Sequence, residues 1–100
     1  MEVVKNKRVY ELYEIFKDYN RIIILTSLFK NELTIEDLSI KTGISVPVLY
    51  HQLEYLISFN IVSKSSYDET FKYKISDKTM NKIIDYMINY VEHEKRTRTI

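Results

Sequence analysis

Apolar residues recur along most of the chain at the three- and four-residue spacing of amphipathic helices. This pattern predicts helices over residues 5–17, 21–30, 34–42, 45–59 and 78–95, with a break or a cap at 18–20. Residues 61–66 and 70–75 are predicted to be two strands around a turn at Tyr67-Asp68-Glu69. In the second strand, apolar and lysine side chains alternate, as in a half-buried strand. We therefore expect a mainly α fold with a small β-hairpin (α+β).

The strongest local signal lies at Thr42-Gly43-Ile44. Gly43 is the only glycine of the chain, and we expect it in the left-handed position just past a helix end. Ser45 then stands where an N-cap belongs, and Pro47, the only proline, falls in the first turn, where its missing N–H is not needed. A helix, a glycine turn and a capped second helix are typical of the helix-turn-helix, a unit that mostly reads DNA.

Three predicted helix starts combine a capping residue with flanking apolar residues at the spacing of a hydrophobic staple. Thr34, with Asp37 three residues later, resembles a capping box. The three staples are Leu33 with Leu38 around Thr34, Ile44 with Leu49 around Ser45, and Ile75 with Met80 around Ser76. In the fourth helix, Leu49, Leu53 and Leu56 form the stripe that we expect to face the core.

Length and composition limit the classes of protein. One hundred residues, of which 45% are hydrophobic, make one domain over residues 1–100. No apolar run approaches the roughly 20 residues of a membrane span, and the N-terminus carries no apolar signal core, so we expect a cytoplasmic protein that does not bind membranes. With no cysteine there is no disulfide framework and no thiolate metal site. The net charge of +1 gives no bulk attraction to phosphate.

The sequence contains no recognisable catalytic motif. The two histidines, His51 and His93, fall on different predicted helices. One glycine cannot make a glycine-rich phosphate loop, and no spacing of serine, histidine and acid residues marks a triad. We therefore expect no enzyme activity, no cofactor and no metal site.

The segment GISVPVLYHQLEYLISFNIV, residues 43–62, resembles the recognition-helix region of ArsR-type winged-helix regulators, and of the PadR and MarR types, in which a similar Leu-Tyr pair opens that helix. Residues 20–25 are similar to the arginine-containing second helix of the ArsR group, and residues 64–76 look like its wing. The resemblance covers roughly residues 19–76 and implies a winged helix-turn-helix, with the unit at 34–59 and the wing at 61–75. Metal-sensing members use Cys and His ligands that this chain lacks, so we expect no metal response.

The resemblance implies that the exposed face of the fourth helix enters a major groove and that the wing contacts DNA. A helical wheel with the leucine stripe inward places Pro47, Tyr50, His51, Glu54 and Ser58 outward. This helix departs from the family pattern because it has no Lys or Arg, and Gln52 lies closer to its packed side. The expected DNA-binding residues are Ser45, Pro47, Tyr50, His51, Gln52, Glu54, Lys64, Lys72 and Lys74.

The terminal helices carry a wider apolar arc than one buried side requires. In the resembled families such helices form a two-fold dimer interface, and exposed apolar surface is otherwise a liability. The alternative is that these residues all pack within one monomer. We expect dimerisation helices at about 5–17 and 78–95, with an interface that includes Leu12, Phe16, Ile84, Met87 and Val91.

Two functions remain open. The first is a homodimeric, sequence-specific regulator of transcription that binds double-stranded DNA. The second is a winged-helix module that binds a protein partner through the same outward face, which the neutral-to-acidic recognition helix favours. Abundant Ile, Lys, Asn and Tyr suggest an AT-rich genome, and small winged-helix proteins of this kind are frequent in archaea and their viruses. In a virus, the host cytoplasm is the expected location.

Overall fold

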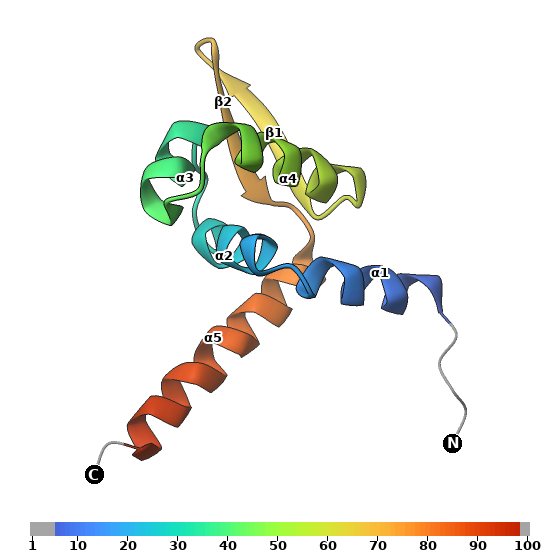
Figure 1. Cartoon of the computed structure of the whole chain (residues 1–100), viewed down its shortest axis with the longest axis vertical. Coiled ribbons are helices and arrows are strands. Elements are labelled where there is room, and N and C mark those ends of the chain that lie inside the picture. Colours follow the sequence, from blue (N-terminus) through green and yellow to red (C-terminus); the bar gives the residue numbers. More distant parts are fainter. Residues whose placement is uncertain (1–5, 99–100) are drawn as a thin grey trace.

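A computed structural model describes residues 6–98 and has the predicted element order, four helices, a hairpin and a last long helix. Helices α1 to α4 and the base of the hairpin surround one core, and α5 leaves the body at an angle (Figure 1). The elements are α1 (Lys7–Phe16), α2 (Tyr19–Leu28), α3 (Ile35–Thr42), α4 (Val46–Ser58), β1 (Val62–Tyr67), β2 (Thr70–Ile75) and α5 (Lys78–Arg98). This is the architecture of a winged helix-turn-helix.

The core is built from one apolar stripe of each helix. The predicted stripe of α4, formed by Leu49, Leu53 and Leu56, is completely buried, as expected. Helix α2 is central, because it packs on α1, α3, α5 and β2. The buried core residues are Ile15, Ile24, Leu25, Leu28, Leu38, Leu49, Leu53, Leu56, Ile61, Val62, Tyr73, Ile75, Met80 and Ile84.

The caps explain where the helices begin and end. Thr34 accepts a hydrogen bond from the Asp37 N–H at 3.1 Å, which confirms the cap of α3. Gly43 ends α3 at φ +75°, the predicted left-handed conformation. Pro47 lies in the first turn of α4, as predicted; Ser45 precedes that helix, but its hydroxyl makes no capping bond.

The start of α5 differs from the prediction. The Asp77 carboxylate, not Ser76, caps this helix by accepting a bond from the Met80 N–H at 2.7 Å. A carboxylate is the stronger acceptor at a helix N-terminus because the helix dipole favours negative charge there. The Ser76 hydroxyl donates instead to the Ile61 carbonyl oxygen at 3.4 Å.

The hairpin is antiparallel, with a register that runs from Val62↔Ile75 to Tyr67↔Thr70. The first strand begins and ends one residue later than expected. Asp68 and Glu69 form a two-residue turn with φ of +45° and +69°, the sign of a type I′ turn, whose twist matches that of the strands. An isolated antiparallel β-bridge beside the hairpin was not predicted: Leu33 and Tyr73 exchange backbone hydrogen bonds of 3.0 and 2.7 Å. This bridge attaches the entry of the helix-turn-helix to the wing.

Three other expectations about burial and helix ends were wrong. The apolar spacing of the first helix predicts Val9, Leu12 and Phe16 on its packed face, but the buried residue of α1 is Ile15. Phe71 was expected in the buried face of β2, but it is 52% exposed because it lies beyond the part of the hairpin that covers the core. Helix α5 continues to Arg98, beyond the end predicted at residue 95. The expectations for Lys5 and for the last two residues lie outside the described residues.

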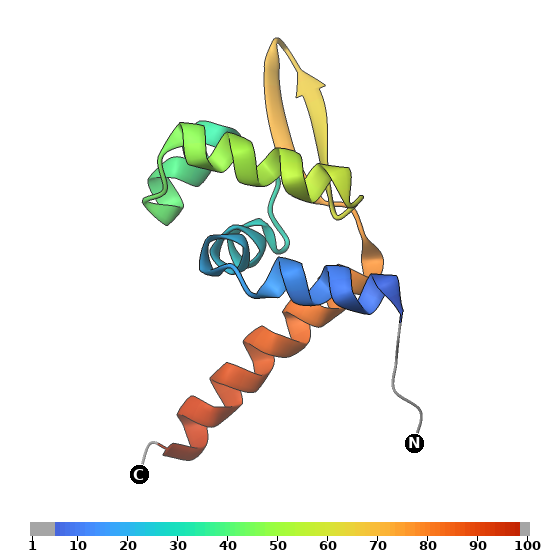
Figure 2. The same ribbon diagram turned by 45° about the vertical axis from the view of Figure 1, so that its right-hand side comes forward.

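The two terminal helices project from the body in different directions (Figure 2). Helix α5 contacts α2 and β2 through its N-terminal part. Its C-terminal part extends past the body, with exposed Tyr86, Tyr90 and Val91. Within residues 6–98, no helix is long and apolar enough to cross a membrane.

We predict that Leu53→Ala lowers the free energy of unfolding by about 2–5 kcal/mol, because it removes a fully buried side chain and leaves a cavity. Thermal and urea denaturation measure the loss. Val48→Ala, a change on the exposed side of the same helix, should shift stability by no more than about 0.5 kcal/mol. Equal melting temperatures for the two variants would mean that the packed face of α4 is misassigned.

Candidate nucleic-acid interface

The exposed face of α4 is the one that the helical wheel predicted. Pro47, Tyr50, His51 and Ser58 are exposed, and Glu54 is partly exposed. Ser45 is exposed just before the helix. Helix α4 carries no lysine or arginine from Val46 to Ser58, so its surface offers polar groups only at Tyr50, His51, Glu54 and Ser58, with apolar side chains between them.

Gln52 does not belong to this exposed face. Its side chain is 8% exposed and is held by two hydrogen bonds: Arg21 Nε donates to Gln52 Oε1 at 2.9 Å, and Gln52 Nε2 donates to Asp18 Oδ2 at 3.3 Å. A buried amide with both ends engaged cannot reach a base edge. The assignment of Gln52 to the DNA-binding face is therefore corrected: its role is to position α4.

Arg21 joins three helices at this point. Its Nη1 donates to the Glu14 carbonyl oxygen of α1 at 2.6 Å, and its guanidinium lies 3.8 Å from the ring centroid of Tyr55 on α4. Asp18 also caps α2, by accepting a bond from the Asn20 N–H at 2.9 Å. The group of Asp18, Arg21 and Gln52, here called the corner network, fixes α4 against the corner between α1 and α2.

The three wing lysines do not share one surface. In the hairpin register Lys64 pairs with Tyr73, whereas Lys72 pairs with Ser65 and Lys74 with Ser63. Paired residues project to the same face of a sheet, so Lys64 lies on the core side of the hairpin, and Lys72 and Lys74 lie on the opposite side. Lys64 Nζ is 4.0 Å from Glu54 Oε1 of α4 and 4.6 Å from the ring centroid of Phe71.

A groove of about 470 Å³ separates the start of α4 from the wing. Its walls are mainly apolar and aromatic, and its charged side chains are two acids and one lysine. Burial raises the pKa of the Tyr73 hydroxyl at its base, so this group stays protonated at neutral pH. We call this the recognition groove; it is lined by Ile35, Glu36, Val46, Tyr50, Lys64, Glu69, Thr70, Phe71 and Tyr73.

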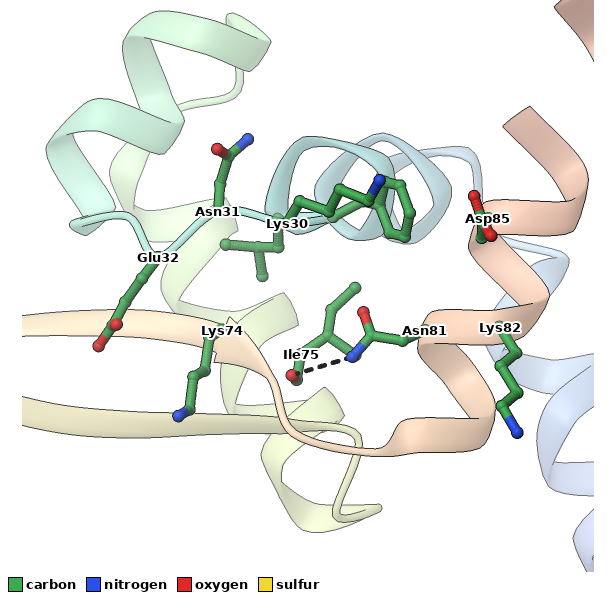
Figure 3. A pocket seen from close by; sticks show the side chains of 10 residues that line it. Lys30, Asn31, Glu32, Lys74, Ile75, Asn81, Lys82 and Asp85 are labelled. Atoms are coloured by element: carbon green, nitrogen blue, oxygen red, sulfur yellow. Dashed lines mark hydrogen bonds between the residues drawn. The ribbon is translucent and has the colours of Figure 1, made fainter. Parts of the chain in front are cut away.

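A second hollow, of about 480 Å³, lies under the opposite face of the wing, between the end of α2, β2 and the start of α5 (Figure 3). Its charged groups do not converge. Lys74 and Lys82 point away from one another, and Lys30 Nζ lies 5.2 Å from the ring centroid of Phe29. Asn81 Nδ2 donates to the Ile75 carbonyl oxygen at 3.5 Å. The part of the chain that the structure describes holds no cluster of three or more His, Cys, Asp or Glu side chains suited to a metal.

The residues expected at a dimer interface fall into two groups. Leu12, Phe16 and Met87 are partly buried and pack against the core, and Val91 is exposed. Ile84 is completely buried within the monomer, so it is a core residue and its assignment to the interface is corrected. The surface of the terminal helices also exposes further large side chains, namely Val9, Tyr10, Tyr13, Tyr86 and Tyr90.

Comparisons with known proteins agree with this geometry. Residues 18–64 match the model of the arsR family of bacterial regulatory proteins, a span that runs from the cap of α2 into β1. No curated protein sequence matches the chain.

Solved structures share the fold over most of the chain. HlyU from Vibrio cholerae N16961 has a TM-score of 0.79 at 24% identity, covering 88% of this chain and 97% of that protein. The transcriptional repressor BigR from Xylella fastidiosa has a TM-score of 0.76 at 19% identity, covering 83% and 85%. The homodimeric winged helix-turn-helix DNA-binding domain of Mb0332 from Mycobacterium bovis has a TM-score of 0.69 at 15% identity, covering 99% and 98%. These likenesses show that the chain has the winged-helix fold.

We predict that Gln52→Ala destabilises the protein by about 1–3 kcal/mol, because it leaves the part-buried donor of Arg21 and the carboxylate of Asp18 without this partner. Urea denaturation gives the difference. His51→Ala, a truncation of the exposed neighbour in sequence, is the matched control and should cost no more than about 0.5 kcal/mol. If both variants unfold at the same urea concentration, the corner network does not hold α4.

Proposed function

We propose that this chain, which carries a helix-turn-helix domain of the bacterial arsR regulatory family, is a homodimeric transcriptional regulator that binds double-stranded DNA sequence-specifically. The observation that carries the proposal is the exposed face of α4 beside an exposed wing, within a domain whose family match spans α2 to β1. In such a domain the N-terminal residues of the second helix contact base edges in the major groove. A regulator of this kind acts where the DNA is, so we place it in the cytoplasm and assign it no enzyme activity.

The proposed contacts divide into two kinds. Ser45, Pro47, Tyr50, His51 and Glu54 would face the bases, because they surround the exposed side of α4. Lys64, Lys72 and Lys74 would meet phosphates, which fix the position of a protein on DNA without reading sequence. Glu54 repels phosphate less than a lone acid would, because Lys64 lies 4.0 Å away. Because the hairpin carries lysines on both faces, the wing could lie between the two sugar-phosphate backbones of the duplex.

The dimer is supported by the terminal helices. Val91, Tyr86 and Tyr90 expose apolar area on a part of α5 that extends past the body of the monomer. Helix α1 exposes Val9, Tyr10 and Tyr13 in the same way. A two-fold pair of such helices would cover this area and would place two copies of α4 against two half-sites of a palindrome.

A second function is favoured by one observation, the lack of any cationic side chain on α4. A largely apolar helix face whose single charged side chain is Glu54 also suits a protein partner, whose interface core is typically depleted in charge. A partner protein bound there would lose affinity when Tyr50 or His51 is replaced, with little dependence on salt. Duplex DNA would then bind weakly and without sequence preference.

We predict that Val91→Glu converts the dimer to monomers, because a carboxylate buried in an apolar interface without a partner is costly. Analytical ultracentrifugation at micromolar concentrations measures the change. Thr79→Glu adds the same charge at the exposed start of α5, where the helix dipole tolerates it, and should leave the dimer intact. A monomeric unaltered chain over the same concentrations would refute the dimer.

Phosphate contacts by the wing predict a specific salt dependence. Lys64→Ala and Lys72→Ala should each weaken binding to all duplexes alike and lower the slope of log K against log salt by about one unit. Lys82→Ala removes the same charge from α5 instead of from the strands of the hairpin, and should leave the slope unchanged. Fluorescence anisotropy over a salt series gives the slopes.

Selection of bound sequences from a random duplex library tests the regulator itself. The unaltered protein should bind the selected duplexes at least about 10³-fold more tightly than random DNA at one salt concentration. The regulator proposal fails if no selected duplex binds more tightly than random DNA at low salt.

A further inference from the structure

The first turns of α4 present an apolar surface that the core does not use. Val46 and Val48 are each 41% exposed and Tyr50 is 54% exposed, with the exposed Pro47 between the two valines. The core takes the other side of the helix through Leu49, Leu53 and Leu56. Packing within the monomer therefore does not account for this surface.

Helix formation does not account for it either. Valine is a weaker helix former than alanine because its branched side chain loses rotamers against the preceding turn. Two valines around a proline at the start of an exposed helix add little to helix stability. These side chains are therefore available for contact with a bound molecule.

The geometry points to thymine methyl groups as the target: we propose that α4 recognises its sites by apolar contact with these methyls in the major groove. The inference rests on the proposed function. On the base edges of the major groove, thymine C5 carries the one apolar substituent, and apolar side chains are its usual contacts. The helix offers no Arg or Lys for bidentate contact with guanine. Its half-sites should therefore be rich in thymine.

The placement of these residues fits contact with several bases. Val46 and Tyr50 are four residues apart, so they share one side of α4, and both line the recognition groove toward the wing. Val48 lies on the other flank of the exposed face, on the side of Tyr55 and the corner network. In the major groove of DNA, α4 would thus present apolar groups to thymines on both sides of the helix axis, while His51 and Tyr50 supply polar contacts.

Uracil substitution tests the inference directly, because deoxyuridine keeps the pairing edge and the O4 acceptor of thymine and removes only the methyl. The duplex is the one selected by the unaltered protein. Each contacted thymine should cost about four-fold in affinity when replaced, the worth of one buried methyl group. Replacing one contacted thymine in each of the two half-sites should lower the affinity about 16-fold. Replacing thymines outside the half-sites should leave the affinity unchanged.

Protein variants, each measured with the thymine duplex and with its uracil-substituted form, complete a double-mutant cycle. Val46→Ala and Val48→Ala should bind the thymine duplex more weakly and should lose part of the preference for thymine over uracil. Ile40→Ala removes an apolar side chain that is 85% exposed on α3 and outside the recognition groove. This control should keep the full preference. Circular dichroism confirms that each variant is folded.

The outcomes separate the inference from the proposed function. If a selected duplex binds more tightly than random DNA but uracil substitution has no effect at any position, the methyl inference is wrong and the regulator stands. The inference is also overturned if the preference for thymine persists in both valine variants. If no duplex is preferred over random DNA, the regulator proposal fails and the methyl inference fails with it.

Discussion

The orientation of the recognition helix depends on Gln52 and the two hydrogen bonds of its amide. Within the part of the chain that the structure describes, Gln52 is the one buried amide or charged side chain. Leucine packing is non-directional, so the stripe of α4 alone would tolerate a small rotation of the helix. The amide does not, because losing either bond would leave a buried polar group unpaired. Arg21 and Asp18 thereby set which side chains of α4 face outward.

This constraint gives the surface an unusual character for a nucleic-acid interface. The outward side chains are mostly apolar or aromatic, and Lys64, the wing lysine on the side of α4, already lies beside Glu54 and Phe71. Attraction to phosphate must then come from a few lysines on the wing, and sequence preference must come from shape and apolar contact at the start of α4. The corner network also contacts α1 through the Glu14 carbonyl. The orientation of α4 is thus joined to a helix proposed for the dimer.

Local patterns predicted most of the fold, and long-range pairing accounts for most of what they missed. The apolar spacing gave every helix within a few residues, and Thr34 and Gly43 gave the caps of α3, because these signals depend only on near neighbours in sequence.

The Leu33–Tyr73 bridge joins residues 40 positions apart, so no local signal predicts it. Four left-handed positions are filled by Lys30, Asn60, Asp68 and Glu69 instead of glycine, so the sequence predicted the turn at residues 67–69 but not the left-handed conformation of its residues. For the candidate site, the outward face of α4 was predictable from a helical wheel. The opposite faces of Lys64 and Lys72 required the strand register, and Gln52 and Ile84 lay at the boundary of a stripe, where contacts with other helices decide burial.

We propose that one surface, formed by the start of α4 and the wing, binds duplex DNA in a two-fold dimer. Nuclear magnetic resonance titration of the isotope-labelled protein with a selected palindromic duplex tests it most directly. We expect the largest chemical-shift changes on residues 45–51 and on the wing, saturation at two chains per duplex, and a single set of signals. Changes confined to the C-terminal half of α5 or to the hollow beneath the wing, or saturation at one chain per duplex, would contradict it.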